Sequence, residues 1–117
     1  TKVDQNSWQI IKEDADYLVL GFKFDQASLV KSNNFLADCK GQAYINLKTG
    51  KLERSEILNE KPLKIKILNL KSLDMDSSLI YDEATKNYLV EKTSLTMLVS
   101  LMGQQVETQE INEYSYR

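Results

Sequence analysis

The stretch from Leu89 to Leu101 constrains the fold more than any other part of the chain. Its second half has an apolar residue at every other position, with Leu95, Met97, Val99 and Leu101 on one face and mostly polar residues between them. Such alternation is typical of a β-strand with one buried face. Threonine, serine and valine throughout the stretch disfavour a helix. At about 3.3 Å per residue the strand would span roughly 40 Å. The sequence therefore predicts a sheet with neighbours on both sides of this strand.

Alternation recurs along most of the chain and predicts a mainly β fold. The other alternating segments are 8–12, 17–24, 41–47, 52–58, 63–70 and 106–116, and 79–81 is a short apolar piece. We expect about six to eight antiparallel strands in a curved sheet, either a meander or a half-barrel. The segment between Asp25 and Lys40 breaks the pattern, and we expect at most one short helix there. No linker or low-complexity run divides residues 1–117, so the sequence predicts a single β-rich domain.

Three places in the sequence predict irregularities. Gly21 lies inside an alternating segment, where a glycine marks a bulge, a bend or close packing against the backbone. The apolar phase changes near Leu68 and Asn69, and a bulge there would keep one face buried. The polar run from Asp74 to Ser78 is interpreted as a turn.

The apolar positions of the alternating segments define a predicted core. Trp8 should be largely buried, because a lone tryptophan has much apolar area to hide. The other predicted core residues are Leu18, Leu20, Phe22, Ile45, Leu47, Ile65, Ile67, Leu95, Met97, Val99 and Leu101.

The composition excludes several kinds of chemistry. There is no histidine and one cysteine, Cys39, so the chain offers no Ser-His or Cys-His nucleophile pair, no histidine-based zinc site and no intrachain disulfide. Cys39 beside Lys40 is a candidate reactive thiol, but a buried structural cysteine is the favoured interpretation. A net charge of −2 with interspersed charges argues against a nucleic-acid surface. No apolar run reaches the roughly 18 residues of a transmembrane segment.

The acidic residues that follow Leu73 form the one candidate metal site. Alternating carboxylates at Asp74 and Asp76 could bind calcium. The EF-hand pattern fails, because Leu79 stands at the glycine position and Thr85 at the position of the bidentate glutamate. We therefore expect a solvated turn, and the sequence predicts no metal, no cofactor and no catalytic residue.

The segment Gly41–Leu52, GQAYINLKTGKL, resembles a hairpin frequent in uncharacterised exported bacterial β-proteins. There a strand written G-x-A-x-[ILV]-[DN]-L-x-T-G leads into a paired strand. The segment Tyr81–Thr85 with the long strand after it, then Gly103 and a closing strand, is similar to the same proteins and to lipoprotein half-barrel domains. The resemblance implies an antiparallel curved sheet in an extracytoplasmic protein, often lipid-anchored through a cysteine upstream of the domain. Cys39 is not that cysteine, since Asp38 stands where the lipidation motif needs a small residue.

The first residue, Thr1, is not a methionine, so we expect either a cleaved signal segment or a shortened sequence. Together with the resemblance, this predicts a periplasmic or cell-surface location and leaves open a membrane anchor upstream of the given residues.

Two hypotheses for function remain, and both describe binding rather than catalysis. In the first, one sheet face or a concave half-barrel binds a small apolar or extended ligand. In the second, exposed strand edges and tyrosines bind a protein partner, in the manner of an inhibitor or immunity-type protein. The candidate contact residues are Tyr44, Val90, Leu98, Tyr114 and Tyr116.

Overall fold

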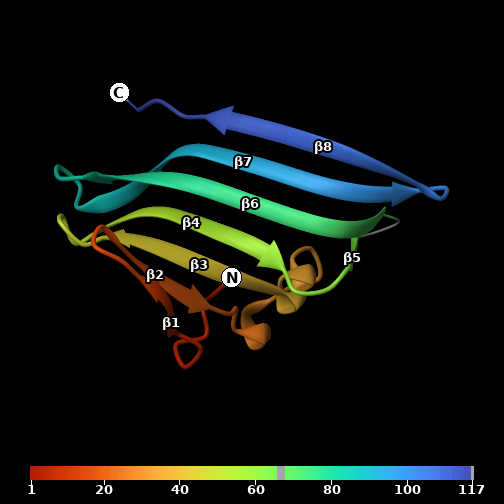
Figure 1. Ribbon diagram of the computed structural model, residues 1–117, viewed down its shortest axis with the longest axis horizontal. Coiled ribbons are helices and arrows are strands. Elements are labelled where there is room, and N and C mark those ends of the chain that lie inside the picture. The colour runs from red at the N-terminus through yellow and green to blue at the C-terminus, as the bar shows by residue number, and fades with distance from the viewer. Residues whose placement is uncertain (66–67, 117) are drawn as a thin grey trace.

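The computed structural model describes residues 1–65 and 68–116, which form one open, curved antiparallel β-sheet (Figure 1). Its eight strands are β1 (Gln9–Glu13), β2 (Tyr17–Phe22), β3 (Cys39–Asn46), β4 (Lys51–Asn59), β5 (Leu63–Ile65), β6 (Leu68–Asp82), β7 (Asn87–Leu101) and β8 (Gln104–Glu113). Their order across the sheet is β1-β2-β3-β4-β6-β7-β8, and the short β5 pairs with β6 beyond the end of β4. The predicted antiparallel meander is confirmed.

The ladder between β6 and β7 is the longest in the sheet. It runs from the pair Asn69 and Ser100 to the pair Asp82 and Asn87, and β8 pairs with the other side of β7. The prediction of a long strand with neighbours on both sides is therefore confirmed.

The predicted turn from Asp74 to Ser78 is wrong, because this segment lies in the middle of β6. Its polar residues satisfy the strand period of two, with Leu73 and Met75 on the opposite face. Arg54 on β4 also provides a charge partner for Asp76. A run of acidic residues can thus remain in a central strand when its side chains share one face and meet a cation there.

Cross-strand pairing gives the sheet two chemically different faces. On one face Ile57, Met75 and Leu95 pair across β4, β6 and β7. We call this the apolar face. On the other, which we call the polar face, Glu56 pairs with Asp76. Because directly paired residues share a face, the register assigns every strand residue to one side or the other.

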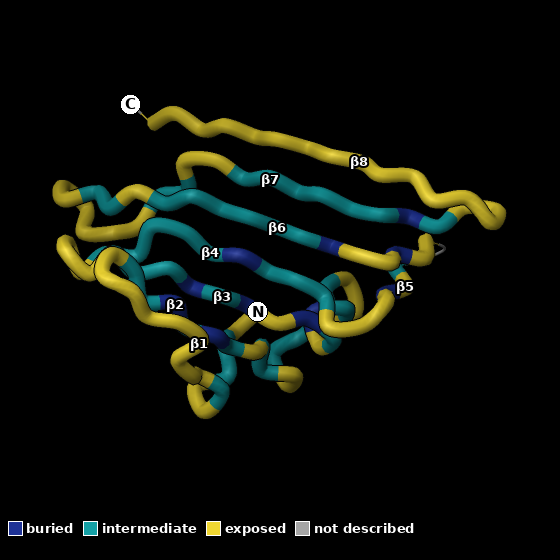
Figure 2. The backbone as a smooth tube through the Cα atoms, viewed as in Figure 1, coloured by how far each residue is buried: buried dark blue, intermediate teal, exposed yellow. Residues whose placement is uncertain are grey.

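Two short 3-10 helices between β2 and β3 cover part of the apolar face. They are η1 (Gln26–Ser28) and η2 (Asn34–Asp38), and they take the place of the single short helix that was expected. Asp25 caps η1, because its carboxylate accepts a hydrogen bond from the backbone N–H of Ala27. The core lies beneath η2 and β5, at one end of the sheet (Figure 2). Its buried residues are Leu36, Cys39, Leu63, Leu70, Leu73 and Val99.

The predicted core is partly correct. Val99 is buried, as predicted. The half-buried members of the prediction are Leu18, Leu20, Phe22, Ile45, Ile65, Leu95 and Met97. The prediction is wrong for Leu47, Leu101 and Trp8, which are 42%, 47% and 39% exposed. Leu47 directly follows β3 and Leu101 ends β7, so both lie at the ends of strands. The Trp8 ring lies against Phe22, with ring centroids 5.0 Å apart, and stays partly open to solvent. Ile67 lies outside the described residues.

Two of the predicted irregularities correspond to register shifts. The pairing of β1 with β2 shifts between Ile10 and Lys12, and the extra residue, Ile11, lies over Gly21. A Cβ atom on Gly21 would be 2.7 Å from Cδ1 of Ile11, so the glycine permits this close approach. In the ladder between β6 and β7 the register shifts between Leu70 and Ser72, slightly later than the position expected from Leu68 and Asn69.

A candidate functional site on the polar face

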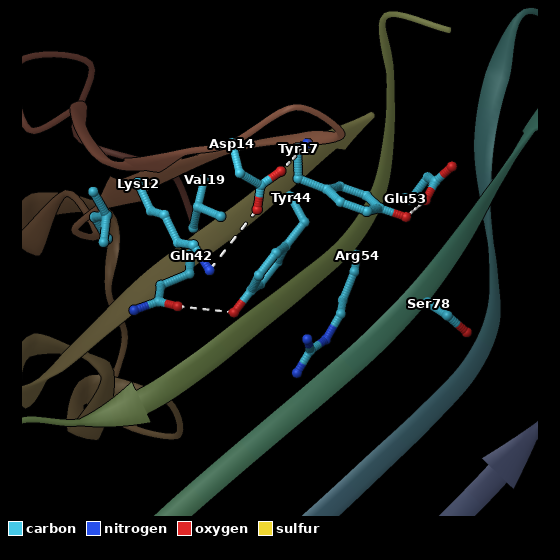
Figure 3. Close-up of a pocket in the computed structure, with 10 residues that line it drawn as sticks. Lys12, Asp14, Tyr17, Val19, Gln42, Tyr44, Glu53, Arg54 and Ser78 are labelled. Atoms are coloured by element: carbon cyan, nitrogen blue, oxygen red, sulfur yellow. Dashed lines mark hydrogen bonds and ion pairs between the residues drawn. The ribbon is translucent and has the colours of Figure 1, made fainter. Parts of the chain in front are cut away.

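A hollow of about 560 Å³ opens on the polar face, between β1 and the strands β2, β3, β4 and β6 (Figure 3). This volume lies within the range of about 300–1,000 Å³ that is typical of small-molecule sites. One cross-strand row runs through the hollow and continues to the far edge of the sheet. Its members, in strand order, are Lys12, Val19, Tyr44, Arg54, Ser78, Lys92 and Glu113.

Two β-bulges supply the hollow with extra side chains. In β1 the shift at Ile11 puts Ile11 and the next residue, Lys12, on the same face. In β4 the pairing shifts between Tyr44 and Ile45, and Glu53 and Arg54 both line the hollow. Each bulge therefore brings two consecutive residues to the hollow, where a regular strand would bring one.

The turn between β1 and β2 holds one wall in place. The carboxylate of Asp14 accepts hydrogen bonds from the backbone N–H groups of Asp16 and Tyr17, both at 2.8 Å. These bonds lower the pKa of Asp14 below its usual value. Lys12 places its Nζ atom 3.9 Å from the same carboxylate. The turn thus fixes where β2 begins, and Tyr17 is its first residue.

The floor of the hollow is apolar and aromatic. Val19 is buried there, Tyr44 pairs with it across β2 and β3, and Tyr17 lies two residues before it on the same face of β2. The hydroxyl of Tyr17 donates to Oε2 of Glu53 at 2.6 Å, and the Asn46 amide donates to Oε1 of the same carboxylate at 2.8 Å. The bond with Glu53 raises the pKa of Tyr17, and the two bonds together lower the pKa of Glu53.

Arg54 is the fixed cation of the hollow. Its Nε atom donates to both carboxylate oxygens of Asp76, at 2.8 and 2.9 Å, and its Nη2 atom bonds the same carboxylate. These bonds are the main reason that the pKa of Arg54 is raised. The guanidinium carbon also lies 4.5 Å from the centre of the Tyr44 ring, a cation–π contact. Within the described part of the chain Nη1 has no hydrogen-bond partner, and 42% of the side chain is exposed. Arg54 can therefore donate to a bound molecule.

Two further carboxyl groups, those of Glu56 and Asp74, lie close together on the polar face, and Oε2 of Glu56 is 3.6 Å from Nη2 of Arg54. Glu56 is 9% exposed, and its pKa is raised by burial and then by the neighbouring carboxyl group of Asp74. Within residues 1–65 and 68–116, the Oδ1 atom of Asp74 is buried without a hydrogen-bond partner. The hydroxyl of Tyr44 lies 3.0 Å from Oε1 of Gln42 and 3.4 Å from Oε1 of Glu56. The hollow thus connects through one tyrosine to the neighbouring carboxyl groups of Glu56 and Asp74.

The five contact residues expected from the sequence do not come together. Tyr44 lines the hollow. Leu98 also lies on the polar face, but in the part of β7 where it pairs with β8, away from the hollow. The backbone carbonyl of Val90 accepts a hydrogen bond from the hydroxyl of Tyr116 at 2.7 Å, and Tyr114 and Tyr116 are exposed beyond the end of β8.

Sequence reasoning missed the residues that the bulges supply, chiefly Ile11 and Arg54. The opposite charges of Arg54 and Asp76 were visible in the sequence, but pairing them requires the register of β4 against β6. The pairing of β4 with β6 skips β5, which a reading of strands in order does not predict.

Comparison of the chain with protein-family models, with curated proteins and with solved structures finds no match. In the part of the chain that the structure describes, no cluster of three or more metal-binding side chains is present. No helix among those residues has the length and apolar character needed to cross a membrane.

Proposed function

We propose that this chain is a binding domain, and that the hollow on its polar face takes one small amphipathic molecule. The observation that carries the proposal is the pairing of an apolar floor with a fixed donor, Arg54, in a hollow of about 560 Å³. Sites for small molecules commonly combine mostly apolar walls with a few well-placed polar groups. The absence of catalysis and the extracytoplasmic location stay predictions, and the N-terminal sequence of the full gene product tests the location.

The apolar part of the ligand would lie on Ile11, Val19 and the two tyrosine rings. Ile11 is 49% exposed and lies at the mouth of the hollow, so a ligand that covers it removes apolar surface from water. Such burial contributes about 25 cal/mol per Å². The tyrosines contribute large rigid surfaces at little cost in side-chain entropy.

The polar part of the ligand would accept a hydrogen bond from Arg54. Both cations of the hollow already have carboxylate partners, Lys12 with Asp14 and Arg54 with Asp76. The hollow therefore has no excess positive charge, and a neutral carbonyl or hydroxyl should be accepted as readily as a carboxylate. We therefore include uncharged amphiphiles, as well as carboxylates, among the proposed ligands.

The test is a thermal-unfolding series with alkyl amides and alkyl carboxylates from hexyl to dodecyl, each kept below its micelle concentration. A ligand that binds only the folded state at ten times its Kd stabilises by about 1.4 kcal/mol. For a domain of this size that raises Tm by roughly 5 °C. The amide series should raise Tm at least as much as the carboxylate series. Absence of a rise in both series would refute the proposal.

A matched pair of variants places the ligand on one face. Ile11→Glu puts a charge at the mouth of the hollow and should abolish the rise in Tm. Ile10→Glu is the control, because Ile10 is 68% exposed and pairs with Leu20 on the apolar face. It should keep the rise. The reverse result would put the ligand on the apolar face instead.

A further inference from the structure

The two outer strands of the sheet are built in opposite ways. The edge strand β1 has five residues, carries Lys12 and is interrupted by the bulge at Ile11. Short length, lysines and bulges are the usual means by which proteins protect a sheet edge from pairing with other chains. The other edge strand, β8, has ten residues and pairs without a register shift along its whole length. All its residues are exposed (Figure 2).

β8 lacks the short length, the lysine and the bulge of β1, and its charged residues are the three glutamates Glu107, Glu110 and Glu113. It contains no lysine and no proline, and its side chains alternate regularly across the two faces. Alternate residues of such a strand direct their N–H and C=O groups to the open side, where another strand can pair. The edge is therefore a ready template for one more strand.

The side chains of β8 indicate the chemistry of that strand. Glu107 and Glu110 lie opposite Leu98 and Leu95 of β7, and within the described residues neither glutamate forms an ion pair. Val106 and Ile111, on either side of this pair of glutamates, are 43% and 50% exposed. The register puts Glu107 and Ile111 on the polar face and Val106 and Glu110 on the apolar face, so each face of the edge presents one glutamate and one apolar side chain.

We propose that β8 binds an extended basic segment of a protein partner, which adds a strand to the sheet. Basic residues of the partner would lie opposite Glu107 and Glu110, and apolar residues opposite Val106 and Ile111. This gives the pattern apolar-basic-x-x-basic-apolar, which is the same whether the added strand is parallel or antiparallel. Opposite charges that face each other across two strands stabilise the pairing, and like charges oppose it.

A second copy of this chain fits the edge less well. Pairing β8 with β8 would bring together six carboxylates, from Glu107, Glu110 and Glu113 of each copy, with no lysine or arginine on either strand. A basic strand neutralises these charges. The charge on β8 therefore favours a partner of different composition over self-association.

The test uses two synthetic peptides and the chain of residues 1–117. The first peptide, TVKTTKVT, has the proposed pattern, and the second, TVETTEVT, differs only in having glutamate for lysine. Backbone amide NMR shifts should change along β8 on addition of the lysine peptide and stay unchanged with the glutamate peptide. Equal binding of both peptides, or shifts elsewhere than β8, would overturn the proposal.

Charge reversal on the chain gives a second readout. The double variant Glu107→Lys/Glu110→Lys should bind the lysine peptide about tenfold more weakly, since two attractive cross-strand pairs become repulsive, and should bind the glutamate peptide instead. The control double variant Glu13→Lys/Glu83→Lys changes the net charge equally at exposed residues away from β8 and should bind like the parent. Loss of binding in the control to the same degree would show a general charge effect and refute recognition by β8. Light scattering of the chain alone should show a monomer, and a concentration-dependent dimer with shifts along β8 would mean self-pairing.

Discussion

Replacing Leu70 by alanine tests where the core lies. Leu70 is 1% exposed and pairs with Leu63 on β5 and with Val99 on β7, so it joins three strands beneath η2. The substitution removes three carbon atoms, which corresponds to roughly 2.4 kcal/mol of lost burial at about 0.8 kcal/mol per carbon. A cavity that collapses incompletely adds to this, and buried leucine-to-alanine changes cost about 2.7–5 kcal/mol. We expect a loss of about 3 kcal/mol in the free energy of unfolding.

Urea denaturation followed by circular dichroism measures this loss. With a slope of about 1.5 kcal/mol per molar urea, the midpoint should fall by about 2 M. Leu101→Ala is the matched control, because Leu101 is 47% exposed at the end of β7 and should lose only about 1 kcal/mol. The sequence pattern placed Leu101 in the core. Equal losses in the two variants would therefore refute the core described by the structure.

Three further predictions concern single residues. Burial and the carboxyl group of Asp74 raise the pKa of Glu56 above its usual value of 4.5, so ionised Glu56 destabilises the fold at any pH above its folded pKa. Glu56→Gln should therefore have a higher Tm than the parent near neutral pH, and the difference in Tm should shrink as the pH falls toward 4.5. A difference in Tm that stays constant with pH would refute the raised pKa of Glu56. Burial raises the pKa of Cys39 to about 11, so the native thiol should resist a disulfide reagent at about pH 8 and react once urea unfolds the chain. Gly21→Ala should change stability by less than about 1 kcal/mol but displace Ile11, so the rise in Tm caused by a ligand of the hollow should become smaller.

Much of the fold could be predicted from alternation alone. Long, regular stretches such as Leu89–Leu101 show the period of a strand clearly, and β7 covers this stretch. The error at Asp74–Ser78 has a specific cause. Carboxylates are common in turns, and only the register with β4 shows that Arg54, which pairs with Ser78, lies diagonally across from Asp76 on the same face. Local patterns describe one strand, whereas the cost of placing a charge in a sheet depends on the strand beside it.

The predicted core was too wide for a related reason. Alternation marks which residues share a face, but it does not show how far that face is covered. In this sheet η2 and β5 cover only one end of the apolar face, so Val99 is buried while Leu95 on the same strand is half-buried. Cys39 and Leu36 belong to the segment that interrupts the alternation. Because no apolar alternation exists there, the sequence did not indicate that these two residues would be part of the core.

The hollow lies where the alternation fails. A regular β1 and a regular β4 would each place one residue fewer on the polar face, and the bulges at Ile11 and Glu53 add the apolar wall and the carboxylate that holds Tyr17. Bulges are found often beside functional sites because they redirect a side chain without ending the strand. The β8 edge differs from the hollow in this respect. Its strand was visible in the sequence as a polar alternating segment, but only the sheet order shows that it is an edge strand and that β1 forms the opposite edge. The two candidate sites therefore have opposite origins. The hollow forms where two strands lose their regular alternation, whereas the β8 edge is a regular strand at the edge of the sheet, where proteins normally interrupt regular strands.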